Sequence, residues 1–309
     1  MHLRFLKFLI TVLLVPTAAT VSHADILFYE GFNYDVGANG LVGQTGGVGF
    51  GSTAWTTASE AATTGVQNAG IVAAGSTEFS DFATFGNVGQ VQNDSAEQGQ
   101  FFVSRELPNS FALVAGSTVY QSYLFRQVAV GGLRDVSTAY SSSTGGSVES
   151  VHNRVNTAFG FNDADSVGFG YDATAEDLGS VYAPLSSVLV INKLENINGS
   201  GSQTGTQWIL SESNFDAIKA GGVTEAELNA NNLGLITETV SGVSLNAGDH
   251  FQIRTRTQSS EVSNAFFDEV KLFTDLNDLQ LTPTNVPEPS SLLLLISVGM
   301  GRCCFRRRR

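Results

Sequence analysis

Alternation of apolar and polar residues with a period of two is the feature that most limits the fold of this chain. In 155–161, 167–171 and 251–256, alternate positions hold aliphatic, aromatic or threonine side chains. Because successive side chains of a β-strand point to opposite faces, this pattern indicates strands with one buried and one solvated face. Two more segments, 119–130 and 188–194, are apolar on both faces, as expected for central strands covered on two sides.

Turn-forming residues separate these segments, and no long helical pattern interrupts them. Thr224 and Glu227 have the spacing of a capping box, which predicts a short helix through Leu228 to Asn231 inside a loop. Further strands are expected at 26–34, 101–106, 207–211 and 265–273. About ten strands with long connections predict an all-β fold, a two-sheet antiparallel jelly-roll sandwich.

The charge distribution excludes nucleic acid as a partner. The whole chain has a net charge of −13, but residues 25–285 hold 9 basic and 28 acidic side chains, a net of 9 − 28 = −19. Such a field repels phosphate backbones and favours divalent cations. The only two cysteines, Cys303 and Cys304, are adjacent and near the end of the chain, so the body must be stabilised by a large core.

The first 24 residues have the three regions of a signal peptide. Basic residues flank and interrupt an apolar run at 5–15, and a small, polar stretch follows. Ser22 and Ala24 place small side chains at the third and first positions before a cut, which predicts cleavage by signal peptidase between Ala24 and Asp25. The alternative, a membrane anchor, requires a longer run to cross ~30 Å of hydrocarbon.

The end of the chain combines a short motif, an apolar stretch and an arginine cluster. Pro287, Glu288 and Pro289 are followed by the apolar residues 292–301 and by the arginines at 306–309. This order resembles the PEP-CTERM sorting signal of Gram-negative bacteria. The resemblance implies a C-terminal hydrophobic helix held briefly in the inner membrane, removal of the tail by an exosortase, and delivery to the cell surface or extracellular matrix. Membrane contact is then limited to the signal peptide and this tail.

Three regions follow: a signal peptide at 1–24, a single β-sandwich domain at 25–281, and a linker with the sorting tail at 282–309. The body also resembles laminin-G-like and concanavalin A-like jelly rolls, which implies that its first and last strands lie near one another. Four segments carry that likeness: 28–34, 46–51 leading to Trp55, 120–126 and 267–272.

Catalytic motifs are absent from the sequence. There is no P-loop, H-E-x-x-H or G-x-S-x-G, and no E-x-D-x-E of the jelly-roll glucanases. Glu225 and Glu227 have a suitable spacing, but the capping box assigns them to a helix start. Asp268 and Glu269 are consecutive, so they are expected on opposite faces of a strand. We therefore expect no enzyme activity and name no catalytic residue.

Carboxylates in one turn offer a candidate Ca²⁺ site. Asp163 and Asp165 lie between two expected strands, and crowded oxygen ligands suit Ca²⁺. The alternative is an ordinary turn with solvated carboxylates. A different role is expected for Asp268, which should share an apolar face with Phe266, Val270 and Leu272 and accept hydrogen bonds there, or bind a cation.

Two tryptophans are candidates for stacking on a sugar ring. Trp55 follows a glycine-rich loop and Trp208 lies beside a polar stretch. Core packing is the alternative for residues of this size. The sequence thus favours an exported, non-catalytic surface or matrix protein, whose body binds extracellular polysaccharide or serves as a structural module. Its two alternatives are an extracellular glycoside hydrolase of the concanavalin A-like fold and a Ca²⁺-stabilised adhesin.

Overall fold

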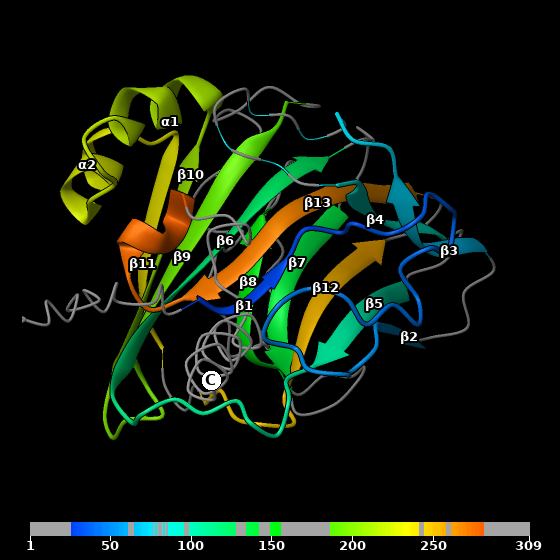
Figure 1. Ribbon diagram of the computed structural model, residues 1–309, viewed down its shortest axis with the longest axis horizontal. Coiled ribbons are helices and arrows are strands. Elements are labelled where there is room, and N and C mark those ends of the chain that lie inside the picture. The colour runs from blue at the N-terminus through cyan, green and yellow to red at the C-terminus, as the bar shows by residue number, and fades with distance from the viewer. Residues whose placement is uncertain are drawn as a thin grey trace, which may run out of the picture.

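The computed structural model is a sandwich of two antiparallel sheets, which confirms the predicted all-β jelly-roll class (Figure 1). It describes residues 26–60, 65–75, 77, 79, 82, 84, 86–95, 99–127, 134–141, 149–155, 186–240, 244–257 and 261–280. The predicted signal helix, the turn with Asp163 and Asp165, the strand predicted at 167–171 and the tail helix all lie outside these residues. Within the described ranges, no helix is both long and apolar enough to cross a membrane.

The described residues form thirteen strands and three short helices. The strands are β1 (Ile26–Glu30), β2 (Thr56–Glu60), β3 (Gly65–Val72), β4 (Val88–Ser95), β5 (Gly99–Glu106), β6 (Ser117–Gln127), β7 (Arg134–Ser141), β8 (Glu149–Val155), β9 (Val188–Ile197), β10 (Gln203–Leu210), β11 (Gly234–Val240), β12 (His250–Thr257) and β13 (Glu261–Phe273). The helices are α1 (Glu212–Lys219), α2 (Glu225–Ala230) and the 3-10 helix η2 (Leu276–Gln280).

The larger sheet has eight strands in the order β11-β10-β9-β6-β13-β4-β3, and β1 also pairs with β13. The smaller sheet has the order β2-β5-β12-β7-β8. β6 and β9 are neighbours in the middle of the larger sheet, and both are apolar on two faces, as the sequence predicts. The pairing of β1 with β13 confirms that the first and last strands of the body lie side by side (Figure 1).

Two hydrophobic layers use the two faces of the larger sheet. The inner layer fills the space between the sheets and includes Phe28, Tyr123 and Phe251. The outer layer lies under the helices, where Phe215 of α1 and Leu279 of η2 are buried. Apolar side chains on both faces of β6 and β9 are therefore needed to complete two separate layers.

Side-chain capping fixes the start of both α-helices. Thr224 accepts a hydrogen bond from the backbone of Glu227, whose side chain bonds back to the Thr224 amide, which confirms the predicted capping box. Ser211 and Asn214 form a second box that begins α1, so the strand predicted to end at Ser211 stops one residue earlier. Both helices lie together near β9, β10 and β11 (Figure 1).

A bulge interrupts β13 at the point where this strand changes partners. Residues 261–267 pair with β4, residues 270–273 pair with β1, and the register with β6 shifts in between. Glu269 has a φ of 53°, in the left-handed region that side chains other than glycine rarely occupy. The alternation of faces is therefore broken at this residue.

The prediction that Asp268 shares a face with Val270 and Leu272 is wrong because of this bulge. Val270 and Leu272 pack in the inner layer instead of beside Asp268. Glu269 lies close enough to Asp268 for its charge to raise the pKa of that carboxyl, and both carboxyls act on the buried Lys271. The predicted burial of Asp268 is confirmed, with 2% of its surface exposed.

The polar cluster around the bulge is satisfied by neighbouring segments. Asp268 accepts hydrogen bonds from the Thr77 hydroxyl at 3.2 Å and from the Glu269 amide at 2.9 Å. Lys271 donates to the backbone oxygen of Leu279 at 2.9 Å, which ties η2 to β13. Burial, together with the nearby Glu269 charge, raises the pKa of Asp268 to about 8.

A buried ion pair holds the segment between β1 and β2 against the sandwich. Glu30 and Arg105 are joined by a bond of 2.7 Å, and their side chains are 1% and 0% exposed. Glu30 also accepts hydrogen bonds from the Phe32 amide, the Tyr34 hydroxyl and the Trp55 indole nitrogen. Burial lowers the pKa of Arg105, although Glu30 partly opposes this effect.

Candidate functional site

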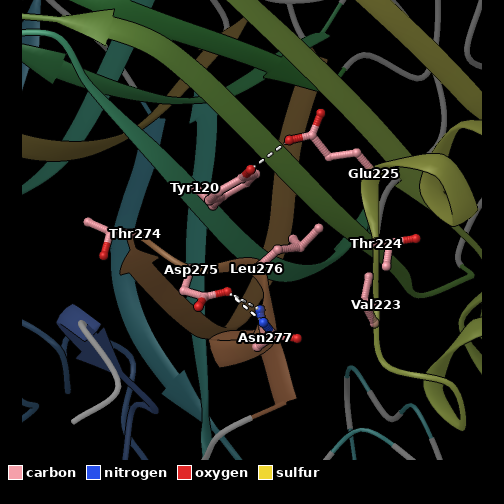
Figure 2. Close-up of a pocket in the computed structure, with 8 residues that line it drawn as sticks. All are labelled: Tyr120, Val223, Thr224, Glu225, Thr274, Asp275, Leu276 and Asn277. Atoms are coloured by element: carbon pink, nitrogen blue, oxygen red, sulfur yellow. Dashed lines mark hydrogen bonds between the residues drawn. The ribbon is translucent and has the colours of Figure 1, made fainter. Parts of the chain in front are cut away.

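A pocket of about 520 Å³ lies on the outer side of the larger sheet, between the start of α2 and the end of β13. Strand β6 contributes Tyr120, the α2 segment contributes residues 223–225, and the chain after β13 contributes residues 274–277. Figure 2 shows Tyr120 and Glu225 pointing toward one another along one side of the pocket. Three segments far apart in the sequence therefore build one polar site.

Glu225 is held in place by two donors from the sheet. The Tyr120 hydroxyl donates to its Oε1 at 2.7 Å, and the Lys193 ammonium donates to its Oε2 at 2.8 Å. Lys193 also binds Glu195 at 2.9 Å. Burial alone would raise the pKa of Glu225, but the bonds from Lys193 and Tyr120 outweigh it and lower that pKa. Glu225 is therefore an ionised acceptor at neutral pH.

The opposite side of the pocket is formed by the turn that follows β13. Asp275 Oδ1 accepts hydrogen bonds from the backbone and side-chain nitrogens of Asn277, at 2.9 Å and 2.8 Å (Figure 2). Thr274 and Leu276 complete this wall. The carboxylate of Asp275 is thus oriented by the turn that carries it.

The aromatic ring in the pocket is mostly covered. Tyr120 stacks on Phe273 with ring centroids 5.7 Å apart and an angle of 16°, and it is 8% exposed. Burial, with the hydrogen bond to Glu225, raises the pKa of Tyr120 above its ordinary value. Tyr120 therefore contributes a polar edge and not an open face for stacking. The pocket is suited to hydrogen bonding with a polar ligand.

The sequence pattern assigns Glu225 to the start of a helix and not to a binding site. The capping box uses only Glu227, which lies at the third position of the helix, so Glu225 is free to turn toward the sheet. No local spacing in the sequence links Tyr120 or Asp275 to Glu225. The only sequence signal for Glu225 as a site residue is its place as a charged residue in the first helical turn, beside the capping box.

Both tryptophans lie in the core, as the alternative interpretation expected. Trp55 is 0% exposed and donates to Glu30, and Trp208 is 1% exposed and donates to Asn229 at 2.8 Å. Trp55 packs against the ring of Phe251. Neither ring is placed to stack on a sugar in this structure.

The other site residues named from the sequence lie outside the described residues. They are Asp163 and Asp165 for the metal, Ala24 and Asp25 for leader cleavage, and Pro287, Glu288 and Pro289 for sorting. In the part of the chain that the structure describes, no three His, Cys, Asp or Glu side chains gather as a metal ion would require.

Comparisons with known proteins give structural likeness at low identity. No family model and none of the curated proteins matches the chain. Solved structures that match include an arabinose-bound GH51 α-L-arabinofuranosidase (9% identity, TM-score 0.33, 81% of this chain and 26% of that one). The carbohydrate recognition domain of Emp47p also matches, with 9% identity and a TM-score of 0.28 over 82% of this chain and 98% of that one. Peanut lectin matches with 9% identity and a TM-score of 0.31 over 72% of this chain and 99% of that one. This chain spans 26% of the length of the arabinofuranosidase. At these TM-scores no residue role passes from these proteins to this chain.

Proposed function

We propose that this chain is an exported, non-catalytic carbohydrate-binding protein of the cell surface or extracellular matrix, and that its body binds a glycan in the pocket over Tyr120. The observation that carries the proposal is the lining of this pocket. Carboxylates, hydroxyls and an amide lie beside the apolar side chains of Val223 and Leu276. Sugars present hydroxyl groups beside apolar C–H faces, so such a lining can satisfy both.

The electrostatics of Glu225 do not suit the general acid of a glycoside hydrolase. A glycoside hydrolase needs one carboxylic acid whose pKa is raised, so that it can protonate the leaving group. Lys193 and Tyr120 lower the pKa of Glu225, which keeps it ionised. A fixed, ionised carboxylate is instead a strong acceptor for sugar hydroxyls.

The two processing signals give this proposal its location. Signal peptidase would remove the leader after Ala24, and an exosortase-type enzyme would recognise Pro287 to Pro289. The body, with its net charge of 9 − 28 = −19, would then meet polysaccharide outside the cell. An acidic surface is consistent with solubility there.

A glycan array probed with the purified full-length chain, with and without Ca²⁺, tests the proposal. Glu225→Gln removes the pocket carboxylate, while Glu227→Gln on the same helix removes an equal charge and keeps a capping residue. We expect Glu225→Gln to weaken binding roughly tenfold, because hydrogen bonds to charged groups contribute about 1.5–3 kcal/mol, and Glu227→Gln to bind like the wild type.

Four outcomes would contradict the proposal. If no glycan binds, or if the two variants bind alike, the pocket is not the glycan site. If new reducing ends form on the oligosaccharides, the chain is a hydrolase. If Ca²⁺ promotes adhesion to proteins without glycan binding, the adhesin alternative replaces it.

A further inference from the structure

The donors and acceptors around the pocket are unequally distributed. We infer that the pocket takes a saccharide with a free, protonated amino group, as in a hexosamine that lacks its N-acetyl group. This inference rests on the proposed function and specifies the ligand of the same site. It follows from the donors and acceptors of the lining residues that remain available to a ligand.

Most hydrogen-bond donors of the lining side chains already bind carboxylates of this chain. The Tyr120 hydroxyl donates to Glu225, the Thr224 hydroxyl to Glu227, and the Asn277 amide to Asp275. Among the eight lining residues, the side-chain donors that remain are the Thr274 hydroxyl and the second amide proton of Asn277. A ligand that only accepts hydrogen bonds, such as a carboxylate or sulfate, finds few partners here.

Acceptors remain, and they are charged. Both hydrogen bonds to Asp275 end on Oδ1, so Oδ2 faces no donor in the described part of the chain. Each Glu225 oxygen accepts one bond and has a further lone pair. A ligand ammonium has three N–H donors and would form charge-assisted bonds with these oxygens.

The local charge favours the same ligand. Glu195, Glu225 and Asp275 contribute three negative charges, and Lys193 contributes one positive charge, a net of −3 + 1 = −2. Lys193 is already shared between two carboxylates, so it is not available to an anionic sugar. A volume of about 520 Å³ lies within the usual range for small-ligand sites, roughly 300–1,000 Å³.

Calorimetric titration of the full-length chain with three oligosaccharides of equal length tests the inference. The probes are a β-1,4-glucosamine tetramer with free amines, its fully N-acetylated form, and a tetramer of galacturonic acid. We expect the free-amine tetramer to bind at least roughly tenfold more tightly than the N-acetylated form, and the uronic acid not to bind. Affinity for the free-amine form should fall as salt is added.

Asp275→Asn and Asp216→Asn provide a matched pair of variants. Both remove one negative charge, but Asp216 lies on α1 and pairs with Lys219 outside the pocket. Only Asp275→Asn should lose the preference for the free amine, with both variants melting as single folded species. Equal loss in both variants would show a diffuse charge effect and overturn the inference.

Two further outcomes would overturn the inference, and they can be told apart from a failure of the proposed function. Equal or tighter binding of the N-acetylated tetramer would show that the amine is not recognised, while glycan binding itself stands. Equal binding of a simple diamine would identify a cation site without saccharide recognition. Failure of all three tetramers to bind, together with an empty glycan array, would refute the proposed function as well.

Discussion

Replacing Glu30 by glutamine should cost about 3–5 kcal/mol of unfolding free energy. Glu30 is buried and accepts four hydrogen bonds, of which the bond from Arg105 is charge-paired at 2.7 Å. Glu30→Gln keeps the size of the side chain but leaves a guanidinium that is 0% exposed without its counter-charge. Breaking a buried pair on one side typically costs about 3–5 kcal/mol, a large share of the roughly 5–15 kcal/mol that stabilises a domain.

Urea unfolding, followed by far-UV circular dichroism and by tryptophan fluorescence, measures this cost. Tyr34→Phe is the control, because it removes one hydrogen bond to the same Glu30 oxygen and leaves both charges paired. That loss should be about 1–2 kcal/mol. Trp55 donates to Glu30, so its fluorescence reports directly on the perturbed site.

A double variant separates the cost of the unpaired Arg105 charge from the cost of the lost hydrogen bonds. Adding Arg105→Met to Glu30→Gln removes the unpaired guanidinium, so the double variant should be at least about 2 kcal/mol more stable than the sum of the single changes predicts. Strict additivity, or a cost of Glu30→Gln below that of Tyr34→Phe, would refute the reasoning.

Four further predictions address the remaining features. Burial raises the pKa of Asp268 from 3.8 to about 8, so the native state keeps a proton that the unfolded chain releases, and this stability is lost as pH rises from about 4 to 8. In urea titrations, the unfolding free energy of Asp268→Asn should therefore rise relative to that of the wild type across this pH range, by at most about 1.4 kcal/mol per pH unit. A difference between the two proteins that does not change with pH would contradict this. If Ca²⁺ binds, we expect it at Asp163 and Asp165, where millimolar Ca²⁺ should raise the melting temperature; an unchanged value against chelator would remove the metal hypothesis. Replacing 287–289 by three alanines should preserve membrane insertion and block processing in a host with the sorting enzyme, whereas equal processing would mean that the tail is only an anchor. Terminal sequencing of the exported protein should begin at Asp25, and an uncut leader would disprove the cleavage site.

The sequence predicts elements whose pattern is local. The alternation at 251–256 marks β12, and the two-sided apolar segments mark β6 and β9. The capping box of Thr224 and Glu227 locates α2 to within a residue. In each case, neighbouring residues carry the whole signal, because strand periodicity and helix capping act over a few positions.

Features set by tertiary structure escape such patterns. The bulge in β13 depends on the strand changing partners from β4 to β1, and nothing in the local sequence requires Glu269 to adopt a positive φ. The face of Asp268 was predicted wrongly for this reason. A period-two argument holds only while a strand keeps one register.

The pocket was not predicted because its parts meet only in the folded chain. Tyr120 and Glu225 are 105 positions apart, and Asp275 comes from a third segment. Each residue has an ordinary local explanation: a strand aromatic, a first-turn acid and a turn former. Their joint role depends on the arrangement of β6, α2 and the end of β13, which no spacing rule encodes.

The position of β13 determines when this protein can acquire its structure during synthesis. β13 is the last described strand to leave the ribosome, yet it lies in the interior of the larger sheet between β6 and β4. Tyr29 and Glu269, which are bonded across β1 and β13, are separated by 240 positions. Until residue 273 has emerged, β6, β4 and β1 each lack a neighbour and present open edges to other nascent chains. Folding of the larger sheet should therefore be slow and should wait until residue 273 has emerged, and a holding chaperone would be most valuable before that point.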